Sequence, residues 1–243
     1  MILMNTMILS DIHGNIAALE AILEDAEKYV VSDCILLGDL IDYGLHSNEV
    51  IERIKEFPYR IECNIWGNHE TSIMNNDYNG FSSPRGADCA RYTNSIMTPG
   101  SKEYIRHDMD PAGVKEFSLH GKRCIAVHGS LGSQRKSIDG NSDLSLYEKY
   151  DYVFSGHSHI PHFFEKYYDA DDPQRRNRKK TIFINPGSAG QPRNMNNRAQ
   201  YVILDMESEE MQFRKVQYDI SKEQRPFNGQ IDEFYMRRLE TGI

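Results

Sequence analysis

Short apolar runs of strand length alternate with stretches in which apolar residues recur at helical spacing in the first third of the chain. The strands predicted here are residues 7–10, 34–37 and 61–65. One predicted helix carries Ile16, Leu19, Ile22, Leu23 and Ala26, and the next carries Val50, Ile51, Ile54 and Phe57, with Ser47 as its N-cap and Pro58 beyond its end. This alternation is typical of βαβ units and indicates an α/β fold.

The second half of the chain is richer in strands. Four more apolar runs predict strands at Cys124–Val127, Tyr152–Ser155, Thr181–Ile184 and Tyr201–Leu204. A helix near Ala87–Met97 lies within a polar segment that extends from Asn75 to Pro111. The spacing of Ile231, Phe234, Tyr235 and Leu239 predicts an amphipathic helix near the end of the sequence, packing on the body.

The composition is that of an ordinary globular protein. Of 243 residues, 39% are hydrophobic and 26% are charged, and no linker rich in Pro, Gly or Ser divides the chain, so we expect one domain over residues 1–243. No apolar run reaches the roughly 18 residues that a membrane helix needs. The formal net charge of −8 disfavours a large nucleic acid as partner, because proteins that bind one are normally basic.

The cysteines and the first residues bear on the cellular compartment. The four cysteines form no Cys-x-x-Cys pair, and three of them, Cys34, Cys63 and Cys124, lie in strand-like runs. We interpret all four as buried free thiols in a reducing cytoplasm. The first seven residues lack the basic flank and cleavage site of a signal peptide. A cytoplasmic location is therefore expected.

Five short polar motifs follow apolar runs in a fixed order. They are Asp11-Ile12-His13, Gly38-Asp39-Leu40-Ile41-Asp42, Gly67-Asn68-His69-Glu70, Val127-His128-Gly129 and Gly156-His157-Ser158-His159. Ligands bind beyond the carboxyl ends of strands in open α/β sheets, so these side chains are expected to converge on one edge. Asp39 has two oxygens with which to bridge two cations, and mixed imidazole and oxygen ligands favour Mn, Fe, Zn, Ni or Co over Ca or Mg.

The order of these motifs closely resembles that of the calcineurin-like metallophosphoesterase superfamily. Asn185-Pro186-Gly187-Ser188, Gln191-Pro192-Arg193 and residues 201–205 resemble the compact bacterial phosphodiesterase-type branch. The resemblance implies a two-sheet β sandwich flanked by helices, with a dinuclear metal site at the carboxyl ends of the strands. It also implies that Asp11, His13, Asp39 and His159 hold one divalent or trivalent transition-metal ion, and that Asp39, Asn68, His128 and His157 hold the other.

The resemblance assigns His69 a role outside the ligand set. In the family, the histidine at this position protonates the leaving oxygen, and Asp42 is the natural carboxylate to orient it. Asp42 departs from the bacterial branch, which usually has glycine there, and instead resembles serine/threonine protein phosphatases and diadenosine tetraphosphate hydrolases. Those enzymes have a phosphate-binding arginine where this chain has Tyr43. Arg193, Arg85 and Arg91 are the candidates to replace that charge, with Arg193 and Asn68 predicted to contact substrate.

We therefore predict a phosphoric ester hydrolase that cleaves a small phosphate ester or anhydride by attack of a metal-bound hydroxide. Diadenosine polyphosphate hydrolase and serine/threonine protein phosphatase are the alternatives within this chemistry. A protein-binding scaffold that has lost catalysis is the alternative outside it, although such relatives generally lose ligands that this chain keeps. The expected partner is a small phosphorylated substrate, with no membrane, and oligomer formation stays open.

The sequence leaves two interpretations open for each of three further features: one charged segment and two histidines. The charged segment from Glu165 to Lys180 is either a solvated hairpin or a lip that contacts a charged substrate or partner. His46 and His162 lie beside motifs in the sequence and either face the site or do not. We interpret His107 and His120 as surface residues.

Overall fold

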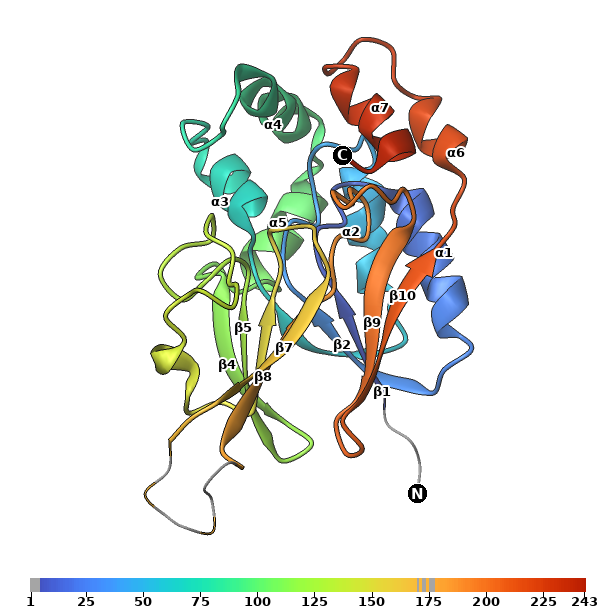
Figure 1. Ribbon diagram of the computed structural model, residues 1–243. Coiled ribbons are helices and arrows are strands. Elements are labelled where there is room, and N and C mark those ends of the chain that lie inside the picture. The colour runs from blue at the N-terminus through green and yellow to red at the C-terminus, as the bar shows by residue number, and fades with distance from the viewer. Residues whose placement is uncertain (1–4, 170, 172–173, 175–177) are drawn as a thin grey trace.

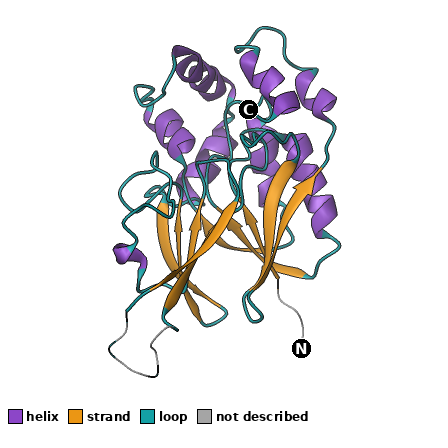
Figure 2. Cartoon of the chain, in the orientation of Figure 1, coloured by secondary structure: helices purple, strands orange, loops and turns teal. Residues whose placement is uncertain are grey.

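Two five-stranded β-sheets face each other and helices surround them in the computed structural model, which describes residues 5–169, 171, 174 and 178–243. Figure 2 shows the strands gathered in the lower half of the view and most of the helices above and behind them. This is the two-sheet sandwich flanked by helices that the sequence predicted, and it confirms the fold class.

The first sheet contains parallel and antiparallel pairs. Its strand order is β10 (Glu210–Val216), β9 (Ala199–Asp205), β1 (Asn5–Leu9), β2 (Val31–Leu36) and β3 (Arg60–Asn64). β1, β2 and β3 pair in parallel, whereas β9 pairs antiparallel with both β1 and β10. Three parallel strands therefore end at the same edge, which is where the first three polar motifs begin.

The second sheet repeats this mixture. Its order is β4 (Val114–Leu119), β5 (Lys122–Val127), β6 (Tyr152–Ser155), β8 (Lys180–Asn185) and β7 (His162–Tyr167). β5, β6 and β8 are parallel, while β4 and β7 pair antiparallel at the two edges. The parallel strands β5 and β6 carry the last two motifs at their carboxyl ends.

Seven α-helices and one short 3-10 helix complete the described part of the chain. They are α1 (Ile16–Ala26), α2 (Ser47–Lys55), α3 (Asn68–Asn75), α4 (Pro84–Ile96), α5 (Pro99–His107), η1 (Ser145–Tyr147), α6 (Ile220–Gln224) and α7 (Phe234–Thr241). Figure 1 shows α3, α4, α6 and α7 above the strands. Among the described residues, no helix has both the length and the apolar composition needed to cross a bilayer.

Alternating side chains of the central strands fill two different cores. Met7 and Leu9 of β1 pack with the helices that cover the first sheet, while Ile8 between them packs against residues of the second sheet such as Phe154 and Ile184. Successive side chains of a strand point to opposite faces, and here both faces are covered. The central strands are therefore apolar almost throughout, which made them visible in the sequence.

Several details differ from the sequence prediction. The N-cap of α2 is His46 and not Ser47, because the Ser47 hydroxyl instead accepts a hydrogen bond from the Asp42 backbone N–H at 3.0 Å. Ile231 lies before the start of α7 and not within it. Within the charged 165–180 segment, Glu165–Tyr167 belong to β7, and residues 170, 172–173 and 175–177 lie outside the described residues, so neither interpretation of this segment is decided.

Candidate metal centre

The five motifs converge at the carboxyl ends of five strands. Asp11, Asp39, Asn68, His128 and His157 follow β1, β2, β3, β5 and β6 within a few residues. Three groups of side chains have ligand atoms within 4.8 Å of one another: Asp11 with His13 and His159, His13 with Asp39 and His69, and Asp39 with His128 and His157. These groups share members, so they form one continuous cluster contributed by both sheets.

The loops that carry these side chains have an unusual backbone. Asp11, His13, Asp39, His157 and His159 all adopt left-handed conformations, with φ between 51° and 64°. Residues other than glycine rarely occupy this region, and isolated examples gather at functional sites. Gly14 is left-handed too, and the ligand candidates themselves make the other sharp turns.

The polar atoms of the cluster lie close together. His159 Nε2 is 3.0 Å from Asp11 Oδ1 and 3.2 Å from His13 Nε2. His128 Nε2 is 3.1 Å from Asp39 Oδ2 and 3.2 Å from Asn68 Oδ1. His13 Nε2 lies 3.8 Å from both Asp11 Oδ1 and Asp39 Oδ2, which places Asp39 between the two halves of the cluster.

Backbone carbonyls fix the orientation of three of the histidines. The Nδ1 atom of His128 donates to Leu37 O at 2.7 Å, that of His159 to Gln191 O at 2.5 Å, and that of His13 to Ile41 O at 3.2 Å. A neutral imidazole with its proton on Nδ1 presents a lone pair on Nε2. All three rings therefore direct an Nε2 lone pair into the cluster, the arrangement that metal-binding histidines use.

Asp11 shows that the cluster has acceptors without donors. Its Oδ2 accepts from the Ser10 hydroxyl at 2.5 Å and from the His157 backbone N–H at 3.0 Å. Its Oδ1 is buried and has no hydrogen-bond partner among the described residues. A buried, unpaired carboxylate oxygen is costly, and a cation among converging lone pairs removes that cost. The donor set thus fits bound metal ions.

His69 lies beside the cluster and is held from its far side. Its Nδ1 is 2.6 Å from Asp42 Oδ2, and Asp42 Oδ1 in turn accepts from the Thr93 hydroxyl of α4 at 2.7 Å. His69 Nε2 is 3.9 Å from Asp39 Oδ2, so this ring borders the cluster. Burial alone would lower the pKa of His69, but the Asp39 and Asp42 carboxylates hold that pKa above its ordinary value.

Glu70 has a structural role that the sequence analysis missed. Its buried carboxylate accepts hydrogen bonds from the backbone N–H groups of Asp39 at 2.8 Å, Leu40 at 2.7 Å and Gly67 at 2.8 Å. It thereby joins the loop after β2 to the loop before α3. A glutamate at the third position of a helix is a recognisable capping signal, and that signal was present in the sequence.

Other candidate residues lie elsewhere. His46 forms an ion pair with Glu223 at 2.8 Å, and the described contacts of His162 are with Ile160 and Phe164, so neither histidine joins the cluster. Arg91 pairs with Asp88 at 2.8 Å on the exposed side of α4. The prediction that Arg91 replaces the missing phosphate-binding charge is therefore not favoured.

Tyr43 occupies a position at the edge of the cluster. Its ring centroid is 4.5 Å from that of His69 and 4.6 Å from that of His13. Arg193 also borders the cluster. Its backbone N–H donates to His159 O at 3.5 Å, and its positive charge, after burial, contributes to a lowered pKa of His159. Arg193 is thus the predicted arginine that lies next to a candidate ligand.

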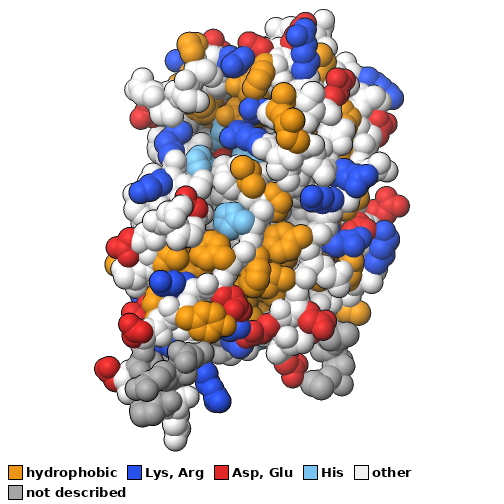
Figure 3. Space-filling view, in the orientation of Figure 1, with side chains coloured by type: hydrophobic (Ala, Val, Ile, Leu, Met, Phe, Trp, Pro, Cys, Tyr) orange, Lys and Arg blue, Asp and Glu red, His pale blue; other side chains and the backbone are white. Residues whose placement is uncertain are grey.

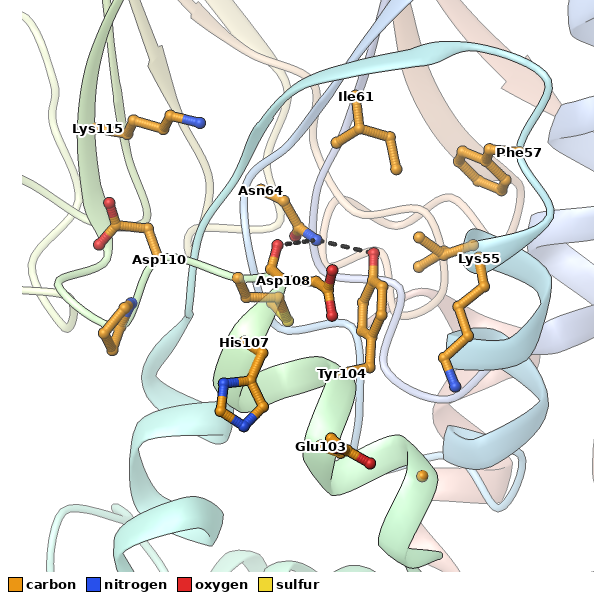
Figure 4. Close-up of a pocket in the computed structure, with 14 residues that line it drawn as sticks. Lys55, Phe57, Ile61, Asn64, Glu103, Tyr104, His107, Asp108, Asp110 and Lys115 are labelled. Atoms are coloured by element: carbon orange, nitrogen blue, oxygen red, sulfur yellow. Dashed lines mark hydrogen bonds between the residues drawn. The ribbon is translucent and has the colours of Figure 1, made fainter.

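A separate cavity of about 850 Å³ lies between α2, β3 and α5 (Figure 4). Asn64 Nδ2 donates to the Tyr104 hydroxyl at 3.0 Å and to Asp108 O at 3.4 Å, and Figure 4 shows both bonds. Lys55 and Lys115 reach this cavity from opposite sides. None of the cluster residues lines it, so we assign it no part in the chemistry of the cluster.

Comparison with known proteins agrees with this geometry. An uncharacterized protein from Methanocaldococcus jannaschii is 29% identical over 254 residues, covering 97% of both chains. The solved structure of a metallophosphoesterase from Sphaerobacter thermophilus is 25% identical, with a TM-score of 0.74 over 99% of both chains. A hypothetical protein from Pyrococcus horikoshii OT3 shares the fold, with a TM-score of 0.82 over 99% of both chains at 21% identity.

Residues 4–209 match the calcineurin-like phosphoesterase superfamily domain, which is most of the chain. The strand-end cluster, the two facing sheets and the match in sequence all lead to the same assignment. This protein belongs to the calcineurin-like phosphoesterase superfamily.

Proposed function

We propose that this protein is a metal-dependent phosphohydrolase that acts on a small phosphate ester or anhydride. The observation that carries this proposal is the inward direction of the Nε2 lone pairs of His13, His128 and His159 toward two buried carboxylates. A scaffold without metal has no need of such an arrangement, because converging acceptors are costly in a protein interior. The retained cluster therefore favours an enzyme over a catalytically silent scaffold.

The proposed ligands divide into two sets that share Asp39. Asp11, His13, Asp39 and His159 would hold one ion, and Asp39, Asn68, His128 and His157 the other. When bound, two such ions supply Lewis acidity and lower the pKa of water in the site. The imidazoles and the Asn68 amide are neutral, so only the Asp11 and Asp39 carboxylates would balance the positive charge of the ions. The positive charge that remains would favour an anionic substrate.

His69 is the proposed general acid. The Asp42 carboxylate accepts from its Nδ1, so the ring is oriented with Nε2 on the side of the cluster. In that orientation a proton on Nε2 is available to a leaving oxygen, and general acid catalysis of this kind contributes roughly 10²–10⁴-fold in rate. Asp42 positions the ring, and Thr93 orients Asp42 through its hydroxyl.

The experiment is a reconstitution. Metal-free protein is loaded with Mn, Fe, Ni, Co or Zn and assayed on p-nitrophenyl phosphate, bis-p-nitrophenyl phosphate, diadenosine tetraphosphate and a phosphoserine peptide. We expect hydrolysis that depends on metal, with the preferred substrate separating monoesterase, diesterase, dinucleoside polyphosphate hydrolase and protein phosphatase. Two bound metals without turnover of any of these substrates would contradict the proposal and favour the scaffold.

We also propose that residues 1–243 form a single domain located in the cytoplasm. The C-terminal helix α7 contacts the body: the ring centroids of Tyr235 and Tyr43 are 4.5 Å apart, and Met195 N donates to Gly242 O at 2.9 Å. The four cysteines are buried and free, which supports a reducing compartment.

A further inference from the structure

Two arginines from different helices meet on one aromatic ring near the metal centre. The guanidinium carbon of Arg85, in α4, is 4.1 Å from the centroid of Phe234, and that of Arg238, in α7, is 4.5 Å from it. Figure 1 shows α4 and α7 above the strands, on the side where the motifs end. Neither arginine forms an ion pair with an Asp or Glu side chain of the described residues, although Arg238 Nε donates to the Ile243 main-chain oxygen at 2.6 Å and leaves the other guanidinium N–H groups of Arg238 for a ligand.

Arg193 extends this pair toward the metal centre. Arg238 is half-buried, and burial together with the neighbouring charge of Arg193 lowers the pKa of Arg238 to about 10, with Arg85 contributing in the same direction. The Arg193 Nε atom is itself buried without a hydrogen-bond partner among the described residues. Three mutually repelling cations without Asp or Glu side-chain partners among the described residues are stabilised when an anion joins them.

A cavity is present at this position. It has a volume of about 540 Å³, and Arg85, Phe234, Arg238 and Thr241 contribute to its lining. Its acidic neighbours are already engaged: Glu233 pairs with Arg237 at 2.7 Å, and Asp232 Oδ1 accepts from Phe234 N at 2.8 Å. In Figure 3, histidine side chains and Lys or Arg side chains lie next to one another in the upper half of the face shown.

A continuous row of rings connects this cavity to the metal centre. Phe234 contacts Tyr235 with centroids 5.5 Å apart, Tyr235 stacks on Tyr43 at 4.5 Å, and Tyr43 contacts His69 at 4.5 Å. The arginines therefore lie beyond the proposed general acid, on the side to which a leaving group departs. Arg193, next to His159, lies between the two regions.

We propose that Arg193, Arg238 and Arg85 bind a second anionic group of the substrate, beyond its leaving oxygen. The substrate is then a phosphate ester or anhydride whose leaving group carries its own negative charge, as a chain of several phosphates does. This inference rests on the proposed hydrolase function and narrows its substrate class. Guanidinium groups suit phosphate oxygens because they donate two parallel hydrogen bonds.

The test compares two substrates in metal-loaded protein. The leaving group of p-nitrophenyl phosphate carries no further phosphate, whereas that of diadenosine tetraphosphate does. Arg238→Met and Arg85→Met keep an apolar stem over Phe234 and remove the charge. The matched control is Arg225→Met, which removes an exposed arginine at the end of α6 outside the cavity. Binding of diadenosine tetraphosphate is measured on the same samples by calorimetry, and Tm by calorimetric scan.

We expect Arg238→Met to lower kcat/KM for diadenosine tetraphosphate about tenfold, mainly through KM, because one charge-assisted contact is lost. Activity on p-nitrophenyl phosphate should stay within about twofold, and Arg225→Met should change neither substrate. Equal losses on both substrates, or no loss on either, would overturn the inference.

A different result is expected if the proposed hydrolase function itself is wrong. In that case the wild-type protein hydrolyses neither substrate with any metal. The calorimetry still decides the inference: binding of diadenosine tetraphosphate that weakens in Arg238→Met and Arg85→Met but not in Arg225→Met supports it, and binding that is absent or equal in all proteins contradicts it.

Discussion

Two buried carboxylates, Asp25 and Asp39, have partners of opposite kinds. Asp25, in α1, is bound by Arg214 Nε at 3.0 Å, Lys28 Nζ at 2.6 Å and the Tyr201 hydroxyl at 2.8 Å. Burial alone would raise the pKa of Asp25, but these donors hold that pKa well below its ordinary range. Its counter-charges are permanent, because arginine and lysine stay protonated at neutral pH.

The side-chain partners of Asp39 Oδ2 are histidines, whose positive charge is exchangeable because an imidazole can gain or lose a proton. Asp39 Oδ2 faces the imidazoles of His128, His13 and His69, and its Oδ1 accepts from His69 N at 2.8 Å. Without metal, burial opposes a charge on His128, yet Asp39 raises the pKa of His128 to about 10. A metal ion binds only to imidazoles that have lost this proton. The Asp25 region thus keeps one charge state, whereas the proposed ligands around Asp39 would exchange protons for metal.

The largest effect is expected for a substitution of Asp39, the carboxylate whose counter-charges are exchangeable. Asp39→Asn should remove activity by more than about 100-fold and lower the content of both metals together, since one oxygen pair serves both sites. Metal analysis of the purified variant measures the effect. If both metals remain at full occupancy, Asp39 is not the bridging residue.

The next effect separates the general acid from the ligands. His69→Ala should lower turnover by roughly 10²–10⁴-fold while both metals stay bound, and Asp42→Asn should lower it less, because Asp42 acts through His69. The loss should be smaller for p-nitrophenyl phosphate than for an alkyl phosphate, whose leaving oxygen needs the proton. Equal losses on the two substrates would instead favour a phosphate-binding role for His69.

These two predictions use residues that the sequence alone located. The motifs follow central strands whose apolar runs are nearly unbroken, so both the strand and the polar residue after it were recognisable. The contacts of Glu70 and Thr93 were less visible, because each depends on a segment about 30 or more residues away in the sequence. The pairing of Arg238 with Arg85 across Phe234 depends on where the last helix packs.

The strands that the sequence analysis missed have a common cause. β4, β7 and β10 are edge strands of the two sheets. Their side chains are largely exposed or half-buried, so polar residues occupy positions that are apolar in central strands. The helices α3, α5 and α6 were missed as well, because each contains at most two large apolar residues, too few to show a period, whereas the equally short α2 and α7 contain more.

A third prediction concerns Asp25, the carboxylate whose counter-charges are permanent, and tests its role in stability. Asp25→Ala should destabilise the protein by about 1–3 kcal/mol, because it leaves the buried Tyr201 hydroxyl without its acceptor and the partly exposed Arg214 without its counter-charge. Metal content and kcat at temperatures well below the midpoint should not change. The measurement is denaturant unfolding of the metal-free protein. A loss of metal without loss of stability would show that the two regions are not independent.

The smallest effect concerns His46 and Glu223, a pair outside both regions. The hydrogen bond to Glu223 raises the pKa of His46, so its stabilisation is fully present below the unfolded-state pKa of about 6.5 and is lost as pH rises through the raised folded-state pKa. Because His46 is partly exposed, with nearby Glu49 and Lys222, we expect less than about 1 kcal/mol. Unfolding of His46→Gln should show a smaller loss of stability over this pH range than the wild type, and an identical pH profile would contradict the assignment. His107→Gln is the control.

The left-handed backbone of the candidate ligands has a consequence for how this protein changes over generations. Each residue other than glycine in that conformation costs about 1–2 kcal/mol, and five of them stand against a typical net stability of about 5–15 kcal/mol. Glycine at Asp11 or His157 would relieve the strain and abolish a ligand in the same step. Relief of backbone strain and retention of a proposed ligand therefore oppose each other at the same positions. A stabilising glycine there would be tolerated only in a lineage that no longer needs the ligand.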